Sequence, residues 1–308
     1  MRAIALIRDV FFTIRFPNLA IICLSFYLTR YTIIIPILDM NGQPSAISGL
    51  AYSILVLATL LIAAAGYVIN DYFDTGMDRI NKPRKNKIGI SLPKNQAVAL
   101  YLVLNSAGIF ASWYFGTLVG IRYPLLVFVL SAGLLYFYSS SYKKMLLIGN
   151  LLIAFLSALT IGLTIMFDST SLKSETIVIL VGAYATFAFL MTLVREMIKD
   201  CEDMKGDSAF GATTFPVTFG TKITRITISL VIFITVTAIL WIQVTQSQWE
   251  NLFSFGYTTC LIQIPLIFIC YRNLIAKTSI DDHRNSNYIK GIMVTGIFSM
   301  LVFYVTSG

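Results

Sequence analysis

Two acidic stretches of the sequence, 70–78 and 199–207, have the residue types and the spacing to do chemistry. In each stretch three aspartates follow one another at intervals of three and then four residues. On an α-helix this spacing brings the three carboxylates onto one face, within reach of a common ion. The two triplets are Asp71, Asp74 and Asp78 in the first stretch, and Asp200, Asp203 and Asp207 in the second.

A bound divalent cation would remove the cost of placing these carboxylates together. Like charges on one helical face repel each other, and the negative end of the helix dipole and a nearby membrane add to that cost. The chain has His283 as its only histidine and no CxxC pair, so the ligands are oxygens. Such a set favours Mg²⁺, which shares its coordination shell with phosphate oxygens, over Ca²⁺, for which the sequence has no EF-hand loop.

The elements that carry the triplets are predicted to be membrane helices. The 308 residues are 57% hydrophobic and 12% charged, with a mean hydropathy of +0.78. Apolar runs of roughly 20 residues in such a composition predict an all-α integral membrane protein, a single domain over 1–308. The nine runs predicted to span the bilayer are 17–37, 47–69, 95–115, 118–138, 146–167, 176–197, 224–243, 252–271 and 288–306.

Lysine and arginine gather in every second gap between these runs, and the other gaps are nearly free of them, Lys173 excepted. This alternation is the pattern of membrane topology, so the net charge of +8 does not indicate nucleic acid binding. Both triplets are therefore expected on the cytoplasmic side of the cell (inner) membrane. The basic gaps are 79–94, 139–145, 199–223 and 272–287.

Residues 1–15 precede the first run and alternate apolar and basic positions. They predict an amphipathic helix at the membrane surface, with Arg2, Arg8 and Arg15 near lipid headgroups. Nothing in the sequence calls for an obligate protein partner.

An internal repeat relates the two triplets. The first triplet follows the second run and the other follows the sixth, an offset of four helices. This offset predicts two four-helix halves plus a ninth span, with the triplets facing each other between the halves.

Basic and aromatic residues near the triplets suggest what the metal would hold. Lys143 ends the fourth span close to Tyr138, and Arg195 and Lys199 flank the second triplet. Such cations would neutralise a diphosphate leaving group, and apolar walls would keep water from an allylic carbocation. A lipid-tailed diphosphate has the matching shape. Candidate aromatic wall residues are Tyr67, Tyr72, Phe73, Tyr136, Tyr138, Tyr142, Tyr184 and Phe187.

Two other interpretations explain single features of the pattern. Isolated aspartates often cap or solvate helix ends, but two triplets with one spacing at equivalent points of a repeat are not explained that way. A metal transporter or cation channel would need charges along its pathway. No acidic residue lies in the middle of a predicted span, which argues against it.

The sequence Asn70-Asp71-x-x-Asp74-x-x-x-Asp78 resembles the first signature of the UbiA superfamily of intramembrane prenyltransferases, and Asp200-x-x-Asp203-x-x-x-Asp207 resembles the second. Within that family, the stretches 195–207, 211–216 and 138–143 with 149–150 are most similar to the archaeal-type digeranylgeranylglyceryl phosphate synthases. One departure is the loop after the first signature, where Asn81-Lys82-Pro83-Arg84 begins as in the family and 85–89 do not continue it.

The resemblance implies a UbiA-like fold and Mg²⁺-dependent transfer of a prenyl group, by preference geranylgeranyl, from its diphosphate to a lipophilic acceptor. The preferred acceptor is geranylgeranylglyceryl phosphate, and an aromatic quinone precursor is the alternative. It also implies that Asp71, Asp74, Asp203 and Lys143 are catalytic, and that the six aspartates hold the metal. The diphosphate contacts would come from Asn70, Tyr138, Lys143, Arg195 and Lys199.

Overall fold

The structure is a computed structural model that describes residues 2–81, 87–245 and 251–307; of residues 2–7 and 307 it describes the backbone alone. The described residues form helices and no β-strand, as predicted. The elements are α1 (Arg2–Thr13), α2 (Phe16–Leu28), η1 (Thr29–Ile34), α3 (Ile35–Met40), α4 (Gly49–Asn81), α5 (Lys94–Val119), α6 (Tyr123–Ser140), η2 (Tyr142–Lys144), α7 (Ile148–Met166), η3 (Ser171–Lys173), α8 (Glu175–Ala209), α9 (Phe215–Thr245), α10 (Leu252–Thr258), η5 (Thr259–Gln263), α11 (Ile264–Ile275) and α12 (Ser279–Ser307).

Nine helical segments in the described part of the chain are long and apolar enough to cross a membrane, which confirms the predicted number. The first joins α2, η1 and α3, and the eighth joins α10, η5 and α11 through a short π-helical stretch. Helices α4 and α8 are 33 and 35 residues long, longer than their apolar runs. Each continues as a helix through its aspartate triplet, so the three aspartates of each triplet lie on one face of that helix.

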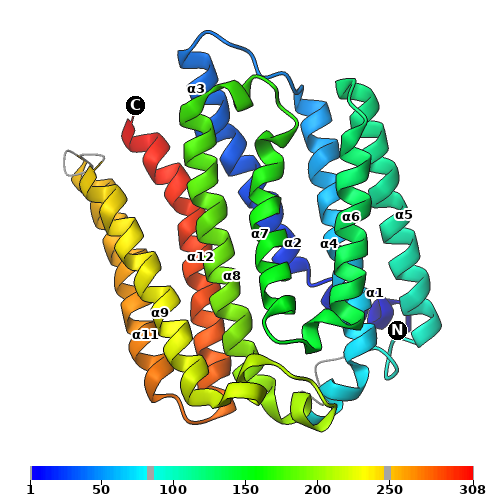
Figure 1. The fold of residues 1–308 in the computed structure, drawn as a ribbon. Coiled ribbons are helices and arrows are strands. Elements are labelled where there is room, and N and C mark those ends of the chain that lie inside the picture. Colours follow the sequence, from blue (N-terminus) through cyan, green and yellow to red (C-terminus); the bar gives the residue numbers. More distant parts are fainter. Residues whose placement is uncertain (1, 82–86, 246–250, 308) are drawn as a thin grey trace.

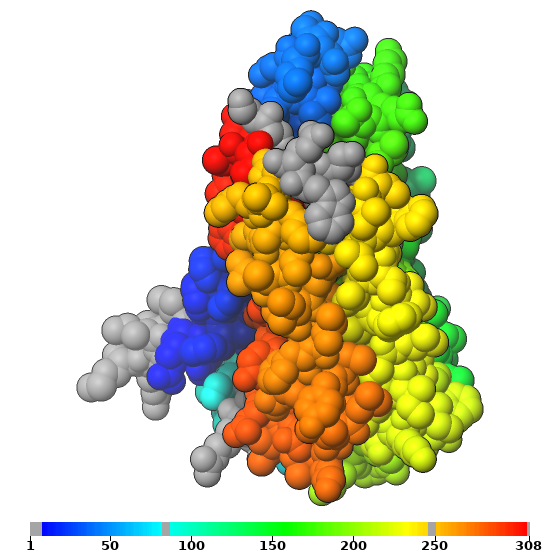
Figure 2. All heavy atoms as spheres, turned by 90° about the vertical axis from the view of Figure 1, so that its left-hand side faces the viewer, coloured from blue at the N-terminus to red at the C-terminus, as the bar shows by residue number. Residues whose placement is uncertain are grey.

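The two predicted halves each have their own apolar core. In the first half Phe26, Tyr52 and Phe115 belong to one buried cluster, while Met197 and Leu266 belong to another in the second half. Helix α12 packs against α8 and also against α2 and η1, so the ninth span closes the bundle between the halves. Figure 2 shows the face covered by α9 (yellow) and α11 (orange). The part of α1 coloured blue projects to the left, below the middle of that face.

The described parts of the predicted basic gaps lie at one end of the bundle. Figure 1 shows the connections α6–α7, α8–α9 and α11–α12 together at its lower end, where α4 also ends, and α3 and the end of α12 at its upper end. Lys82, Arg84 and Lys85, which belong to the first basic gap, lie outside the described residues.

Candidate active site

A polar cavity of about 600 Å³ lies where the lower parts of α4 and α8 face each other. Helical continuation of both apolar runs brings the two triplets to this cavity from opposite sides. The predicted phosphate-contacting residues and Asn70 also lie on its walls. The site residues brought together here are Asn70, Asp71, Asp74, Asp78, Tyr138, Lys143, Arg195, Lys199, Asp200, Asp203 and Asp207.

Asp74 and Asp200 each accept a hydrogen bond from a side chain of another segment. Asp74 accepts hydrogen bonds from Lys143 Nζ and, at 2.8 Å, from Asn70 Nδ2 one turn earlier on α4. Asp200 accepts a hydrogen bond of 2.7 Å from Asn150 Nδ2 on α7. These donors fix the orientation of the carboxylates before any ligand binds, which is what a preorganised site requires.

Lys143 is held in place by an unusually close approach of its backbone to α7. A Cβ atom at Gly149 would lie 2.7 Å from Lys143 Cα and 2.9 Å from the Tyr142 carbonyl oxygen, so residue 149 must be glycine for η2 to pack there. Burial lowers the pKa of the Lys143 ammonium from its ordinary value, and the Asp74 carboxylate opposes that change. Lys143 therefore keeps its charge through its contact with the acidic helix.

The two non-glycine residues with positive φ in the described chain stand at turns that deliver cavity residues. Arg15, with φ of 53°, separates α1 from α2, and Leu147, with φ of 56°, precedes α7 and Asn150. A left-handed conformation costs a non-glycine residue about 1–3 kcal/mol and tends to occur at functional sites. Packing around the cavity therefore overrides the local preference of both residues.

The prediction that Arg15 lies near lipid headgroups is wrong. Its Nη2 donates a hydrogen bond of 2.8 Å to Asp71, and its guanidinium lies 4.9 Å from the centre of the Tyr67 ring. Burial alone would lower the pKa of Arg15, but the Asp71 carboxylate raises it above its ordinary value. The turn after α1 points this residue into the bundle, where an acidic partner compensates the loss of water.

Arg195 and Lys199 share the carboxylate of Glu196, for which no role was predicted. Arg195 Nη1 donates to Glu196 at 2.9 Å, and Lys199 Nζ donates to both of its oxygens at 2.7 and 3.0 Å. Glu196 is only 8% exposed, so these cations make a buried charge tolerable. Arg195 Nε is buried and has no hydrogen-bond partner among the described residues.

Lys290 on α12 is a further cavity residue that the sequence reasoning missed. It lines the polar cavity, and its Nζ donates a hydrogen bond of 2.6 Å to Asn18 Oδ1 on α2. The available signal was its position inside the apolar run 288–306, because a charge within a predicted span is a functional candidate.

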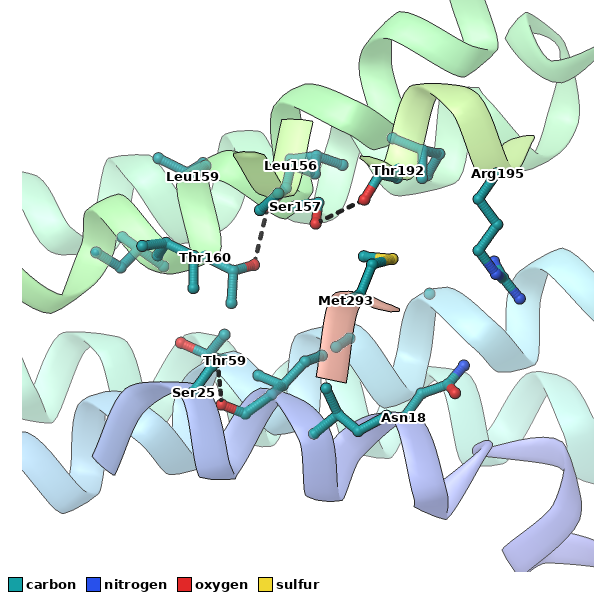
Figure 3. Close-up of a pocket in the computed structure, with 18 of the residues that line it drawn as sticks. Asn18, Ser25, Thr59, Leu156, Ser157, Leu159, Thr160, Thr192, Arg195 and Met293 are labelled. Carbon is teal, nitrogen blue, oxygen red and sulfur yellow. Dashed lines mark hydrogen bonds between the residues drawn. The ribbon is translucent and has the colours of Figure 1, made fainter. Parts of the chain in front are cut away.

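An apolar cavity of about 320 Å³ adjoins the polar one and extends between the helices. Both cavities are lined by Asn70, Tyr138 and Arg195, so these residues mark the junction. Figure 3 shows the continuation past Thr192 and Ser157, which are joined by a hydrogen bond of 3.0 Å, toward Thr160. Of the candidate aromatic residues, Tyr67, Tyr138, Tyr184 and Phe187 line this cavity, whereas Tyr72, Phe73, Tyr136 and Tyr142 do not.

The residues present fit a magnesium ion that shares its ligands with a substrate. Asn70 Oδ1 is buried beside the first triplet and has no hydrogen-bond partner among the described residues. No three histidine, cysteine, aspartate or glutamate side chains of the described residues come close enough to enclose a metal on their own. Mg²⁺ commonly keeps waters and is bound through a few carboxylates plus substrate phosphates, so this open set of oxygens suits it.

Comparisons with known proteins agree with the fold and with the family that the sequence resembles. Residues 19–284 match the UbiA prenyltransferase family. The digeranylgeranylglyceryl phosphate synthase of Methanobrevibacter smithii is 33% identical over 263 residues, which cover 82% of this chain and 87% of that protein. The enzyme of the same name from Saccharolobus solfataricus is 31% identical over 261 residues, which cover 83% and 85%.

Solved structures share the architecture over nearly the whole chain. A structure of digeranylgeranylglyceryl phosphate synthase has a TM-score of 0.62 at 23% identity and covers 97% of this chain and 98% of its own. A UbiA homolog from Archaeoglobus fulgidus bound to DMAPP and Mg²⁺ has a TM-score of 0.58 at 15% identity, with coverage of 96% and 99%. At these identities the likeness shows the fold.

Proposed function

The chain belongs to the UbiA prenyltransferase family, and from this premise we propose that it transfers a geranylgeranyl group from geranylgeranyl diphosphate to geranylgeranylglyceryl phosphate, with Mg²⁺ as cofactor. The observation that supports this most strongly is the junction of two cavities. One is polar and lined by two aspartate triplets, and the other is apolar, has a volume of about 320 Å³ and extends between the helices, where we place the lipid tail. Relatives at 31–33% identity that carry the synthase name favour this acceptor.

Each group of cavity residues has a role in this proposal. Asn70 and the six aspartates would hold Mg²⁺ and the diphosphate, and the bound ion would neutralise the negative charge of the departing diphosphate. Tyr138, Lys143, Arg195 and Lys199 contact the diphosphate oxygens. Arg15 and Asn150 orient Asp71 and Asp200 by the hydrogen bonds described above.

The reaction breaks the bond between the allylic carbon and the diphosphate oxygen. The acceptor hydroxyl oxygen forms the new ether bond to that carbon, and its proton passes to a cavity carboxylate or to the acceptor's own phosphate. Lys143 is held at the cavity by Asp74, where its charge opposes the charge of the leaving group. Tyr67 and Tyr138 contribute aromatic rings to the wall of the apolar cavity, and the apolar walls exclude water from the cation.

The placement in the cell follows from the charged loops. We assign the lower end of the bundle in Figure 1 to the cytoplasmic side of the cell membrane, because the predicted basic gaps lie there. In this proposal the whole chain forms one domain, and α1 lies on the membrane surface. The protein acts on lipid substrates within surrounding membrane lipids and needs no protein partner or nucleic acid.

The test is an assay with purified protein, geranylgeranyl diphosphate and geranylgeranylglyceryl phosphate in the presence of Mg²⁺. We expect release of diphosphate and a product mass that corresponds to the doubly prenylated ether, and we expect EDTA to stop both. Transfer to an aromatic quinone precursor and not to the glycerol phosphate would overturn the acceptor assignment. Metal uptake into vesicles without any prenyl transfer would support a transporter instead.

A further inference from the structure

Lys290 lies in an unusual position for a lysine in a membrane helix. It stands eleven residues after Ser279, the start of α12, about 16 Å along the helix. A lysine near the end of a span commonly directs its ammonium outward to the headgroups. Lys290 is instead half-buried and directs Nζ inward, to Asn18 on α2. The Lys290 ammonium therefore lies at the wall of the polar cavity and not at the headgroups.

The partner of Lys290 differs in kind from those of the other cations described above. Arg15 and Lys143 form ion pairs with Asp71 and Asp74. Lys290 donates to a neutral amide oxygen, and Arg15 and Arg195 line the same two cavities as Lys290. A desolvated ammonium among cations is costly unless an anion compensates it, so this side of the cavity is suited to a negatively charged ligand.

Arg195 provides further donors on the same side. Its Nη1 is engaged by Glu196, while its buried Nε has no hydrogen-bond partner among the described residues. Figure 3 shows the Arg195 side chain extending from α8 toward the side on which Asn18 lies. An ammonium, a guanidinium and an amide from α12, α8 and α2 thus line both cavities, whereas Asp74 and Lys143 line the polar cavity alone.

We propose that Lys290, Asn18 and Arg195 form the subsite that binds the phosphate monoester of the acceptor lipid. The inference rests on the proposed function and adds the means by which a phosphorylated acceptor is selected. The donor diphosphate is bound on the side of the triplets, where a metal offsets the carboxylates. Lys143 and Lys199 contact that diphosphate, Lys290 and Asn18 bind the acceptor phosphate, and Arg195 contacts both. Both subsites line one cavity, so the acceptor's hydroxyl can reach the allylic carbon.

Steady-state kinetics of Lys290→Met test this assignment. We expect the KM for geranylgeranylglyceryl phosphate to rise about tenfold or more, as for loss of a charged hydrogen bond, and the KM for geranylgeranyl diphosphate to stay within about twofold. Lys290→Arg should recover much of the loss. Lys222→Met, at an exposed position of α9, is the matched control and should behave as wild type in both measurements.

Binding without metal provides a second readout that does not depend on turnover. In EDTA and phosphate-free buffer, wild type should bind geranylgeranylglyceryl phosphate more tightly than geranylgeranylglycerol, and Lys290→Met should reduce that preference about tenfold or more. If wild type forms the ether but Lys290→Met raises the KM of the diphosphate, or leaves both KM values unchanged, the inference is wrong and the proposed function stands. If wild type does not prenylate the glycerol phosphate, both are wrong.

Discussion

Asn81 and Gly206, 125 residues apart in the sequence, hold the lower ends of the two triplet helices together. The Gly206 N–H donates to Asn81 Oδ1 at 2.9 Å, and Asn81 Nδ2 donates to the Asp203 carbonyl oxygen at 3.0 Å. A Cβ atom at residue 206 would overlap the Asn81 amide group. The last residue of α4 therefore sets the position of the α8 segment that carries the second triplet.

Asn81→Ala should reduce turnover by about 10- to 100-fold, because small misplacements in an active site are costly. It should also lower the Tm, since each lost hydrogen bond contributes about 0.5–1.5 kcal/mol. Gly206→Ala should also reduce turnover and lower the Tm, because the added Cβ atom would displace the Asn81 side-chain amide. In the Asn81→Ala background, however, Gly206→Ala should cost little further, because the overlapping group is gone. Additive losses of kcat and Tm in the double variant would contradict this coupling.

The sequence predicted the fold well because its signals are local. The length of an apolar run and the period of a helix are properties of neighbouring residues, so nine spans and two helical triplets could be predicted. The four-helix offset placed α4 and α8 at equivalent points, and the structure brings their triplets to one cavity. The catalytic and metal-binding roles of these residues stay predictions.

The partners of the triplets could not be predicted, because they depend on how distant segments pack. Arg15 had the pattern of a surface anchor, yet the left-handed turn before α2 points it at Asp71. Asn150 carries no charge, and its bond to Asp200 depends on the turn at Leu147. The position of Lys290, a charge within an apolar run, could have identified it as a functional candidate. Its partner Asn18 could not be predicted from the sequence.

Asp74→Asn and Asp203→Asn should each reduce turnover at least about 100-fold while the protein stays folded and inserted. Either change removes a charge from the metal-binding side of the cavity and keeps the size of the side chain. Asp39→Asn, an exposed carboxylate of α3, is the matched control and should keep wild-type turnover. The measurement is diphosphate release over a Mg²⁺ titration. Wild-type rates from either cavity variant at limiting Mg²⁺ would argue against the metal assignment.

The lowered pKa of Lys143 predicts a pH dependence. Its ammonium carries a charge below that pKa and loses it as the pH rises through it, at a lower pH than for an ordinary lysine. The kcat/KM for the prenyl diphosphate should therefore fall on the alkaline side. Lys143→Arg should be less active at neutral pH but should lack this alkaline fall, because a guanidinium stays charged. An unchanged alkaline fall in Lys143→Arg would assign it to another group.

Thr160 should control the length of the prenyl tail that the apolar cavity accepts. It lines that cavity twelve residues after Ile148, the start of α7, about 18 Å along the helix and away from the polar end. Thr160→Trp should fill the channel there, and an overpacking cost of about 1–3 kcal/mol predicts a loss of about tenfold or more in kcat/KM for geranylgeranyl diphosphate.

Dimethylallyl diphosphate provides the control within the same variant. Its short tail ends before Thr160, so Thr160→Trp should use it as well as wild type does, and Thr160→Ser should use both donors normally. A parallel loss for the short and the long donor would show general damage to the site. A loss confined to the long donor would instead place the tail along α7, because a blocked channel penalises only the substrate that must pass the blockage.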